Sequence, residues 1–234
     1  MLSLLELLQR LIERTYRMET GIVEIGRYVI GDEGYRRFYP SFGRGGAPPA
    51  PGQRQAVGQA GGRARVLVHD APAAVAAHIY FPDELILNLE QYPPTRWLAD
   101  ENVDDFATFV EEIDHLLLIA ERVRLGRPVS LLELEMHANV TKYLVCALFR
   151  ARGRSRGAGG SVEPEDRLWL RWHLFEKAEF AEADREVQCR YRDASCFAHR
   201  FLDRLETERE APARLALLRA FHDSSHQEKL AALA

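Results

Sequence analysis

Cysteine is scarce in this sequence. The chain of 234 residues contains three cysteines, Cys146, Cys189 and Cys196, and no C-x-x-C pair. An odd number of cysteines without that pairing argues against a disulfide framework and indicates buried or free thiols in a reducing compartment. We therefore expect a cytoplasmic protein.

Long apolar runs are also missing. Nowhere do roughly 18 apolar residues follow one another without a charge, so we expect no transmembrane helix. Residues 1–8 are mainly apolar, but Glu6 interrupts them, no Lys or Arg precedes them and no small-residue cleavage site follows. Because a signal peptide needs those features, we expect neither a leader nor a membrane partner.

An excess of positive charge is the third absence. The chain carries 31 Lys plus Arg against 35 Asp plus Glu, a formal net charge of -4. This balance lacks the general attraction to phosphate backbones that nucleic-acid binders have, so we do not expect a nucleic-acid partner. A phosphate-binding glycine loop, a nucleophile elbow and a kinase signature are missing as well.

What the sequence does contain is the composition of a globular protein, 47% hydrophobic and 28% charged. Its patterning predicts a mainly helical α+β fold, in which a small sheet packs on a pair of helices with helical extensions at both ends. We divide the chain into an N-terminal helix with a packed segment (1–40), a flexible Gly- and Pro-rich linker (41–63), a core (64–150), a flexible loop (151–164) and a C-terminal helical region (165–234).

The helices are predicted from apolar residues that recur every three or four positions. This spacing indicates helices over residues 2–20, 102–123 and 131–150, and again from about residue 165 almost to the end. Gly126 and Pro128 mark the end of the second helix, and Ser130 with Glu133 forms a capping-box signature at the start of the third.

The strands are predicted from short β-like runs. Residues 65–69 and 78–81 are such runs, and residues 84–89 alternate leucine with other side chains, with a turn expected at residues 82–83. We therefore expect two or three strands in one small sheet. The segment 22–39 is compatible with either a short strand or irregular structure.

The most informative motif is the sequence Glu-Glu-Ile-Asp-His at residues 111–115. Residues four apart share one face of a helix, so Glu111 and His115 are spaced to hold one metal ion, with Glu112 beside them. Glu135 on the next helix is the candidate for a third ligand. A fourth position left to water would make a metal-bound nucleophile.

At this point the sequence resembles the minimal zincin fold of bacterial metallopeptidases that act in stress response and on phage repressors. The resemblance spans about residues 65–149: a short sheet, a helix in the place of the H-E-x-x-H helix, and a helix with a glutamate. It implies that Glu112 is the general base, and that His115 and Glu135 are ligands of a divalent metal, with zinc as the first candidate. Glu111 stands where the family has its first histidine, a change that favours a harder metal such as Mn or Fe, or a catalytically impaired relative.

Three other interpretations remain open for these residues. Glu111, Glu112 and Asp114 are also compatible with a solvated helix face, with His115 as a boundary histidine that is hydrogen-bonded to a neighbour. His222 and His226, one turn apart, form half of a second metal site. A di-iron helical bundle would combine Glu112 and His115 with single carboxylates, for which the candidates are Glu13, Glu19 and Glu135, but its second E-x-x-H is missing because His173 and Glu176 stand in reverse order.

Two functions are compatible with these motifs. The first is a metal-binding zincin-like protein, either an active metallopeptidase that acts on a protein or peptide or a pseudoenzyme. The alternative is a non-enzymatic module whose helical ends bind a protein partner. Stoichiometric metal in the purified protein separates the two.

Overall fold

The fold is described by a computed structural model that covers residues 2–38, 55–57, 64–71, 74–154, 162–177 and 185–233. Over these residues the chain is mostly helical with one small sheet, as predicted from the sequence. None of the helices in this part of the chain is long and apolar enough to cross a membrane. Most of the linker at 41–63 and residues 155–161 of the predicted loop fall outside the described residues, so the flexibility predicted there stays a prediction. Residues 151–154, predicted as loop, form the end of a helix.

The sheet has four strands in the order β1-β4-β3-β2. Strands β2 (Gln55–Val57), β3 (Arg65–Ala71) and β4 (Ala74–Tyr80) pair antiparallel, whereas the two-residue β1 (Val29–Ile30) pairs parallel with β4. The predicted strands at 65–69 and 78–81 are confirmed. The undecided segment 22–39 forms a 3-10 turn (Ile25–Tyr28), strand β1 and helix α2 (Asp32–Phe38).

The strand predicted at residues 84–89 is wrong, because this segment lies in helix α3 (Asp83–Gln91). Leu85 and Leu89, four residues apart, are buried, whereas Leu87 between them is 62% exposed. A leucine at every second position satisfies a helical spacing and a strand spacing at once. Pro82 before the helix and the acidic residues of its first turn favour the helix.

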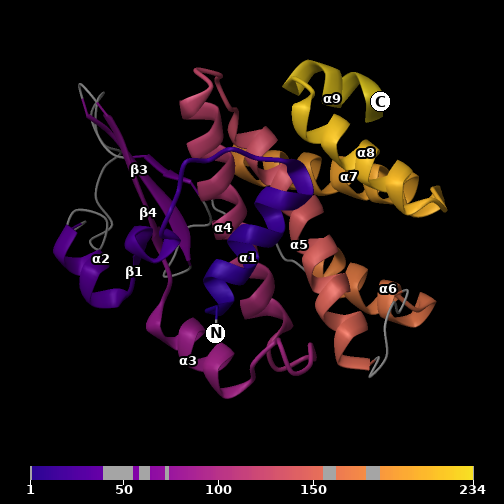
Figure 1. The fold of residues 1–234 in the computed structure, drawn as a ribbon, viewed down its shortest axis with the longest axis horizontal. Helices are drawn as coiled ribbons and strands as arrows, with labels where there is room; N and C mark the ends of the chain where they lie inside the picture. Colours follow the sequence, from indigo (N-terminus) through magenta and orange to yellow (C-terminus); the bar gives the residue numbers. More distant parts are fainter. Residues whose placement is uncertain are drawn as a thin grey trace.

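Two long helices form the centre of the molecule (Figure 1). Helix α4 (Val103–Arg124) contacts the sheet through β3 and β4, and α5 (Leu131–Arg154) packs alongside α4. The end predicted at Gly126 is confirmed, since this glycine has a φ of 62°. The N-cap predicted at Ser130 is confirmed too, because its hydroxyl accepts a hydrogen bond from the Glu133 N–H at 3.1 Å.

The remaining helices cover this central pair. Helix α1 (Leu4–Tyr16) packs on α4 and on α8 (Ala211–Asp223), while α6 (Pro164–Arg171) and α7 (Arg185–Thr207) pack on α5. A π-helical turn (Trp172–Glu176) follows α6, and α9 (His226–Leu233) ends the chain beside α7. Figure 1 shows α7, α8 and α9 on the side of α5 opposite the sheet.

One continuous hydrophobic core joins these layers. It includes residues from the N-terminal helix, the sheet, the central pair and the C-terminal helices, among them Leu8, Ile79, Phe106, Ile113 and Leu202. Fully buried side chains on both long helices fix their mutual packing, and polar groups on the same helices are thereby taken out of water. The boundaries predicted at 64, 150 and 165 remain a prediction.

Candidate functional site: a buried metal-ligand cluster

Three candidate ligands come together between α4 and α5. Glu111 and His115 lie one turn apart on α4, and Glu135 lies on α5. One ligand atom from each of the three lies within 4.8 Å of the others, and the His115 Nε2 to Glu135 Oε2 distance is 3.9 Å. Two ligands of one ion at bonds of about 2 Å stand roughly 3 to 4 Å apart, so modest side-chain movement satisfies the geometry.

The cluster is buried. His115 is fully buried, Glu135 and Glu112 nearly so, and Glu111 partly. Neither ring nitrogen of His115 has a hydrogen-bond partner among the described residues. A buried polar group without a partner costs about 1–3 kcal/mol, so such a histidine calls for an explanation. The interpretation as a solvated helix face is therefore wrong for Glu112 and Asp114, which are buried, and His115 is not the hydrogen-bonded boundary histidine of that interpretation.

The carboxylates control the charge of His115. Burial lowers its pKa, but the nearby carboxylates of Glu112, Glu135 and Glu111 outweigh burial and raise the pKa to about 10. Burial raises the pKa of Glu135 to about 7, with His115 opposing and the other acids adding to the shift. Without a metal, the imidazolium is thus the cation that balances the acids around it.

Glu111 already has a cationic partner. The Lys142 ammonium, one helix away on α5, donates a hydrogen bond to Glu111 Oε2 at 2.8 Å. Burial raises the pKa of Glu111, but Lys142 and His115 together bring it below its usual value. Glu111 is therefore ionised, as a metal ligand must be, and a metal would compete with Lys142 for it.

Glu112 lies on the other edge of the imidazole. Its Oε2 is 3.6 Å from His115 Nδ1, whereas Glu135 approaches Nε2. The backbone N–H of Val66 on β3 also hydrogen-bonds to the Glu112 carboxylate, and burial raises its pKa. Glu112 is thus placed between the sheet and the ring, where a carboxylate orients a histidine.

The di-iron arrangement is not formed by the described residues. Glu13 accepts a hydrogen bond from the Thr20 hydroxyl, and Glu19 pairs with Arg124 at the surface. His173 pairs with Asp100 at 3.0 Å. Glu13, Glu19 and His173 are thus engaged elsewhere, and of the three single-carboxylate candidates only Glu135 lies beside His115.

A second polar cluster was only half anticipated from the sequence. His222 is buried, but it contacts His137 and Glu121, and the side chain of His226 lies outside the described residues. The predicted pairing of His222 with His226 therefore stays a prediction. Asp114, Glu121 and His137 were not selected as candidate site residues from the sequence. The pattern that indicates them is a pair of acids seven residues apart on one face of α4, together with a histidine inside an apolar helix.

Comparisons with known proteins return nothing: no family model, no curated protein and no solved structure matches this chain. The likeness to the minimal zincin fold therefore has one structural observation behind it, the proximity of Glu111, His115 and Glu135.

Proposed function

We propose that this protein binds one divalent metal ion between α4 and α5, with His115, Glu111 and Glu135 as ligands. The observation that carries the proposal is the convergence of these groups around a fully buried imidazole whose two nitrogens lack hydrogen-bond partners among the described residues. Buried polar clusters of this kind are costly unless every group is satisfied, and a cation coordinated by all three would satisfy them.

The donor set fits a borderline or hard divalent ion. One imidazole nitrogen and two carboxylate oxygens are ligands of zinc, and the two carboxylates also suit manganese or iron. Two ionised carboxylates offset the charge of a divalent ion, so a metal replaces the imidazolium proton as the balancing cation. Zinc is the first candidate, and manganese is the second.

The residues around the ligands have distinct parts in this proposal. Glu112 Oε2 lies 3.6 Å from Nδ1 of His115, so a small movement on metal binding would let it accept the Nδ1 proton and leave Nε2, the nitrogen facing Glu135, as the ligand atom. Lys142 competes with the ion for Glu111. When bound, a divalent ion supplies Lewis acidity toward water or a carbonyl. The position of Glu112 at Nδ1 favours a binding protein over an active metallopeptidase, because a general base faces the reacting water.

The proposal is tested by metal analysis of the purified full-length protein. We expect close to one zinc or manganese ion per chain, retained after gel filtration, and recovered when chelator-treated protein is given the metal. His115→Gln and Glu135→Gln should each lower the metal content to background. His199→Gln on α7 and Glu90→Gln on α3 are matched controls at residues outside the cluster, and should keep the metal.

The proposal is refuted if every preparation is metal-free and the protein also fails to bind added zinc or manganese. The helical interaction module is then the remaining hypothesis. Glu112→Gln separates the finer alternatives. A metallopeptidase loses peptide hydrolysis in this variant and keeps its metal, whereas a binding protein shows no hydrolysis in either form and a weakened metal affinity.

Lys142→Met tests the competition for Glu111. Removing an ammonium 2.8 Å from Glu111 Oε2 frees that oxygen and removes a positive charge beside the ion. We expect the affinity for zinc to rise about tenfold, the equivalent of roughly 1.4 kcal/mol. An affinity equal to or below that of the unaltered chain would show that Glu111 is not a ligand.

A further inference from the structure

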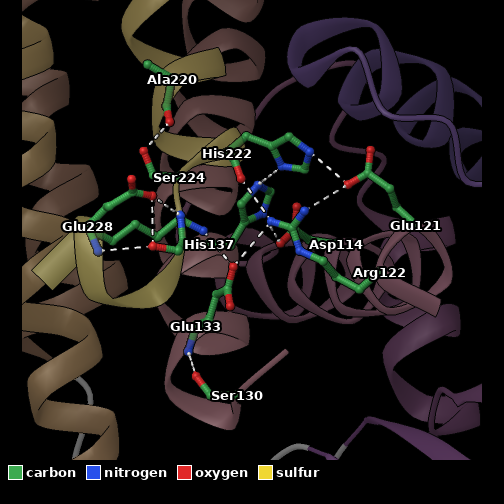
Figure 2. Close-up of polar contacts among 12 residues, drawn as sticks. Asp114, Glu121, Arg122, Ser130, Glu133, His137, Ala220, His222, Ser224 and Glu228 are labelled. Carbon is green, nitrogen blue, oxygen red and sulfur yellow. Dashed lines mark hydrogen bonds and ion pairs between the residues drawn. The ribbon is translucent and has the colours of Figure 1, made fainter. Parts of the chain in front are cut away.

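Four buried side chains form a continuous series of hydrogen-bond and ion-pair contacts near the candidate metal site (Figure 2). Asp114 Oδ2 lies 2.7 Å from His137 Nδ1, His137 Nε2 lies 3.1 Å from His222 Nδ1, and His222 Nε2 lies 2.8 Å from Glu121 Oε2. All four side chains are buried. We call this set the Asp-His-His-Glu chain.

The Asp-His-His-Glu chain joins three helices. Asp114 and Glu121 lie on α4, His137 lies on α5 and His222 lies on α8, so the contacts start and end on the same helix. His222 is the member that closes the circuit, because it alone reaches both the α5 histidine and the second acid of α4.

The contacts of this chain are short and of two kinds. Asp114 to His137 and His137 to His222 are hydrogen bonds, and His222 to Glu121 is an ion-pair contact, with a carboxylate at each end of the series. Charge-assisted bonds of this kind are roughly twice as strong as neutral ones.

Neighbouring groups hold His222 in this position. Arg122 donates to the His222 carbonyl at 2.9 Å and to Glu133 at 3.2 Å, and Lys229 of α9 donates to the same Glu133 oxygen at 2.7 Å. The ring of Tyr16 lies against both imidazoles, with centroids at 4.5 Å and 5.4 Å. These charged groups thereby anchor the two helices that carry His222 and Lys229 on the central pair of helices, α4 and α5.

Two members of the Asp-His-His-Glu chain, Asp114 and His137, lie within two residues of candidate ligands in the sequence. Asp114 precedes His115 on α4, and His137 follows Glu135 by two residues on α5. The Asp114 to His137 hydrogen bond therefore ties the two helices together at the level where the ligands of each helix lie. A ligand set shared by two helices depends on their spacing, and groups that fix this spacing are positioning residues.

We propose that His222 is a positioning residue of the metal site: by closing the Asp-His-His-Glu chain it holds α4 and α5 at the spacing at which Glu111, His115 and Glu135 coordinate one ion. This inference rests on the proposed metal-binding function. It also gives the helices after residue 210 a part in that function, since α8 carries His222 and α9 carries Lys229.

The test uses cobalt(II) as a probe of affinity and of ligand geometry in the full-length, chelator-treated protein. His222→Phe keeps a ring but leaves His137 and Glu121 without their partner, and we expect the cobalt affinity to fall by about tenfold or more, with a shift of the d–d absorption bands. His222→Gln, which retains one hydrogen bond, should fall between the unaltered chain and His222→Phe and serves if the phenylalanine variant does not fold.

Leu218→Ala is the matched control, because Leu218 is a buried apolar residue of the same helix and loosens α8 without touching the polar chain. It should leave the cobalt spectrum unchanged. If the unaltered protein binds cobalt and both His222 variants have the same affinity and spectrum, the positioning role is refuted and the metal site is retained. No cobalt, zinc or manganese binding by the unaltered chain overturns both.

Discussion

His115 is the residue on which the proposed metal site depends. A histidine inside a helix carries little information in the sequence, since many such residues are satisfied by a neighbouring carbonyl or acid. Here three carboxylates surround the ring at distances too long for hydrogen bonds, and both nitrogens remain without hydrogen-bond partners among the described residues. That combination is the reason for proposing His115 as a ligand.

The raised pKa values of His115 and Glu135 predict how stability depends on pH. In the folded metal-free protein the pKa of His115 moves from 6.5 to about 10, and that of Glu135 from 4.5 to about 7. The folded state therefore holds more protons than the unfolded state between pH 4.5 and pH 10, and its stability falls as the pH rises through this window. We expect a loss of more than about 1 kcal/mol between pH 6 and pH 9.

Urea unfolding of chelator-treated protein at several pH values measures this loss. His115→Gln should flatten the slope above pH 6.5. His199→Gln should not flatten that slope, because burial and Arg171 lower the pKa of His199, and a lowered histidine pKa contributes to the pH dependence with the opposite sign. A stability that rises from pH 6 to pH 9 would contradict the charge assignment of the cluster. Metal affinity should show the opposite trend and increase with pH, since the ligand nitrogen must lose its proton.

At the scale of single elements, the helix ends are the most local features of the fold. Helix α4 ends with Gly126 in the left-handed region, at a φ of 62°, and the Arg127 N–H bonds back to the Arg122 carbonyl at 2.9 Å. Such an end reverses the chain within a few residues and lets α5 start beside α4. This turn therefore contributes to the spacing of α4 and α5, the two helices that carry the candidate ligands.

Gly126→Ala tests the cost of that conformation. A Cβ at this position meets nothing within 4 Å, so the expected loss of about 1 kcal/mol in unfolding free energy comes from the positive φ alone. Gly26→Ala is the matched control, because this glycine also has open space around it and is not at positive φ. Equal effects of the two substitutions in thermal or urea unfolding would refute the argument.

The prediction of secondary structure failed where one sequence pattern is compatible with both a strand and a helix. The leucines at 85, 87 and 89 alternate as in a strand, yet Leu85 and Leu89 also lie one helical turn apart. The segment is helical because its face with Leu85 and Leu89 is buried against the central helices. These neighbours are distant in sequence. In contrast, Gly126 and Ser130 were predicted correctly, because a cap depends only on residues within one turn.

At the scale of the whole molecule, the last helices are fastened to the centre by buried charge. Lys229 of α9 is buried and donates to Glu133 of α5, which also accepts from Arg122 of α4. Burial lowers the pKa of Lys229 while Glu133 opposes the shift. A charge removed from water in this way stabilises the fold only while its partner is present.

Lys229→Met is therefore expected to lower the unfolding free energy by about 3 kcal/mol, since Glu133 loses one of its two cations. The double variant Lys229→Met with Glu133→Gln should lose less than the sum of the two single changes, as a double-mutant cycle on urea unfolding would measure. Lys177→Met removes an ammonium that pairs with Asp104 at an exposed site, and should cost less than about 1 kcal/mol. Equal losses at both lysines would contradict the role assigned to burial.

The sequence by itself determined the features that depend on near neighbours. The helical spacing of apolar residues, the caps at Gly126 and Ser130, and the position of Glu111 and His115 on one face of a helix all follow from the geometry of a single turn. These features were enough to predict a mainly helical α+β fold and to select the three candidate ligands.

Only the tertiary structure decided which polar groups meet. Lys142 is 31 residues from its partner Glu111, and His222 is 85 residues from His137. Such pairs form because hydrophobic burial fixes how helices pack, and the packing then brings buried acids, imidazoles and ammonium groups to partners that no local pattern specifies. The placement of Glu112 at Nδ1 and of Glu135 at Nε2 of one ring has the same origin, and with it the function proposed for the protein.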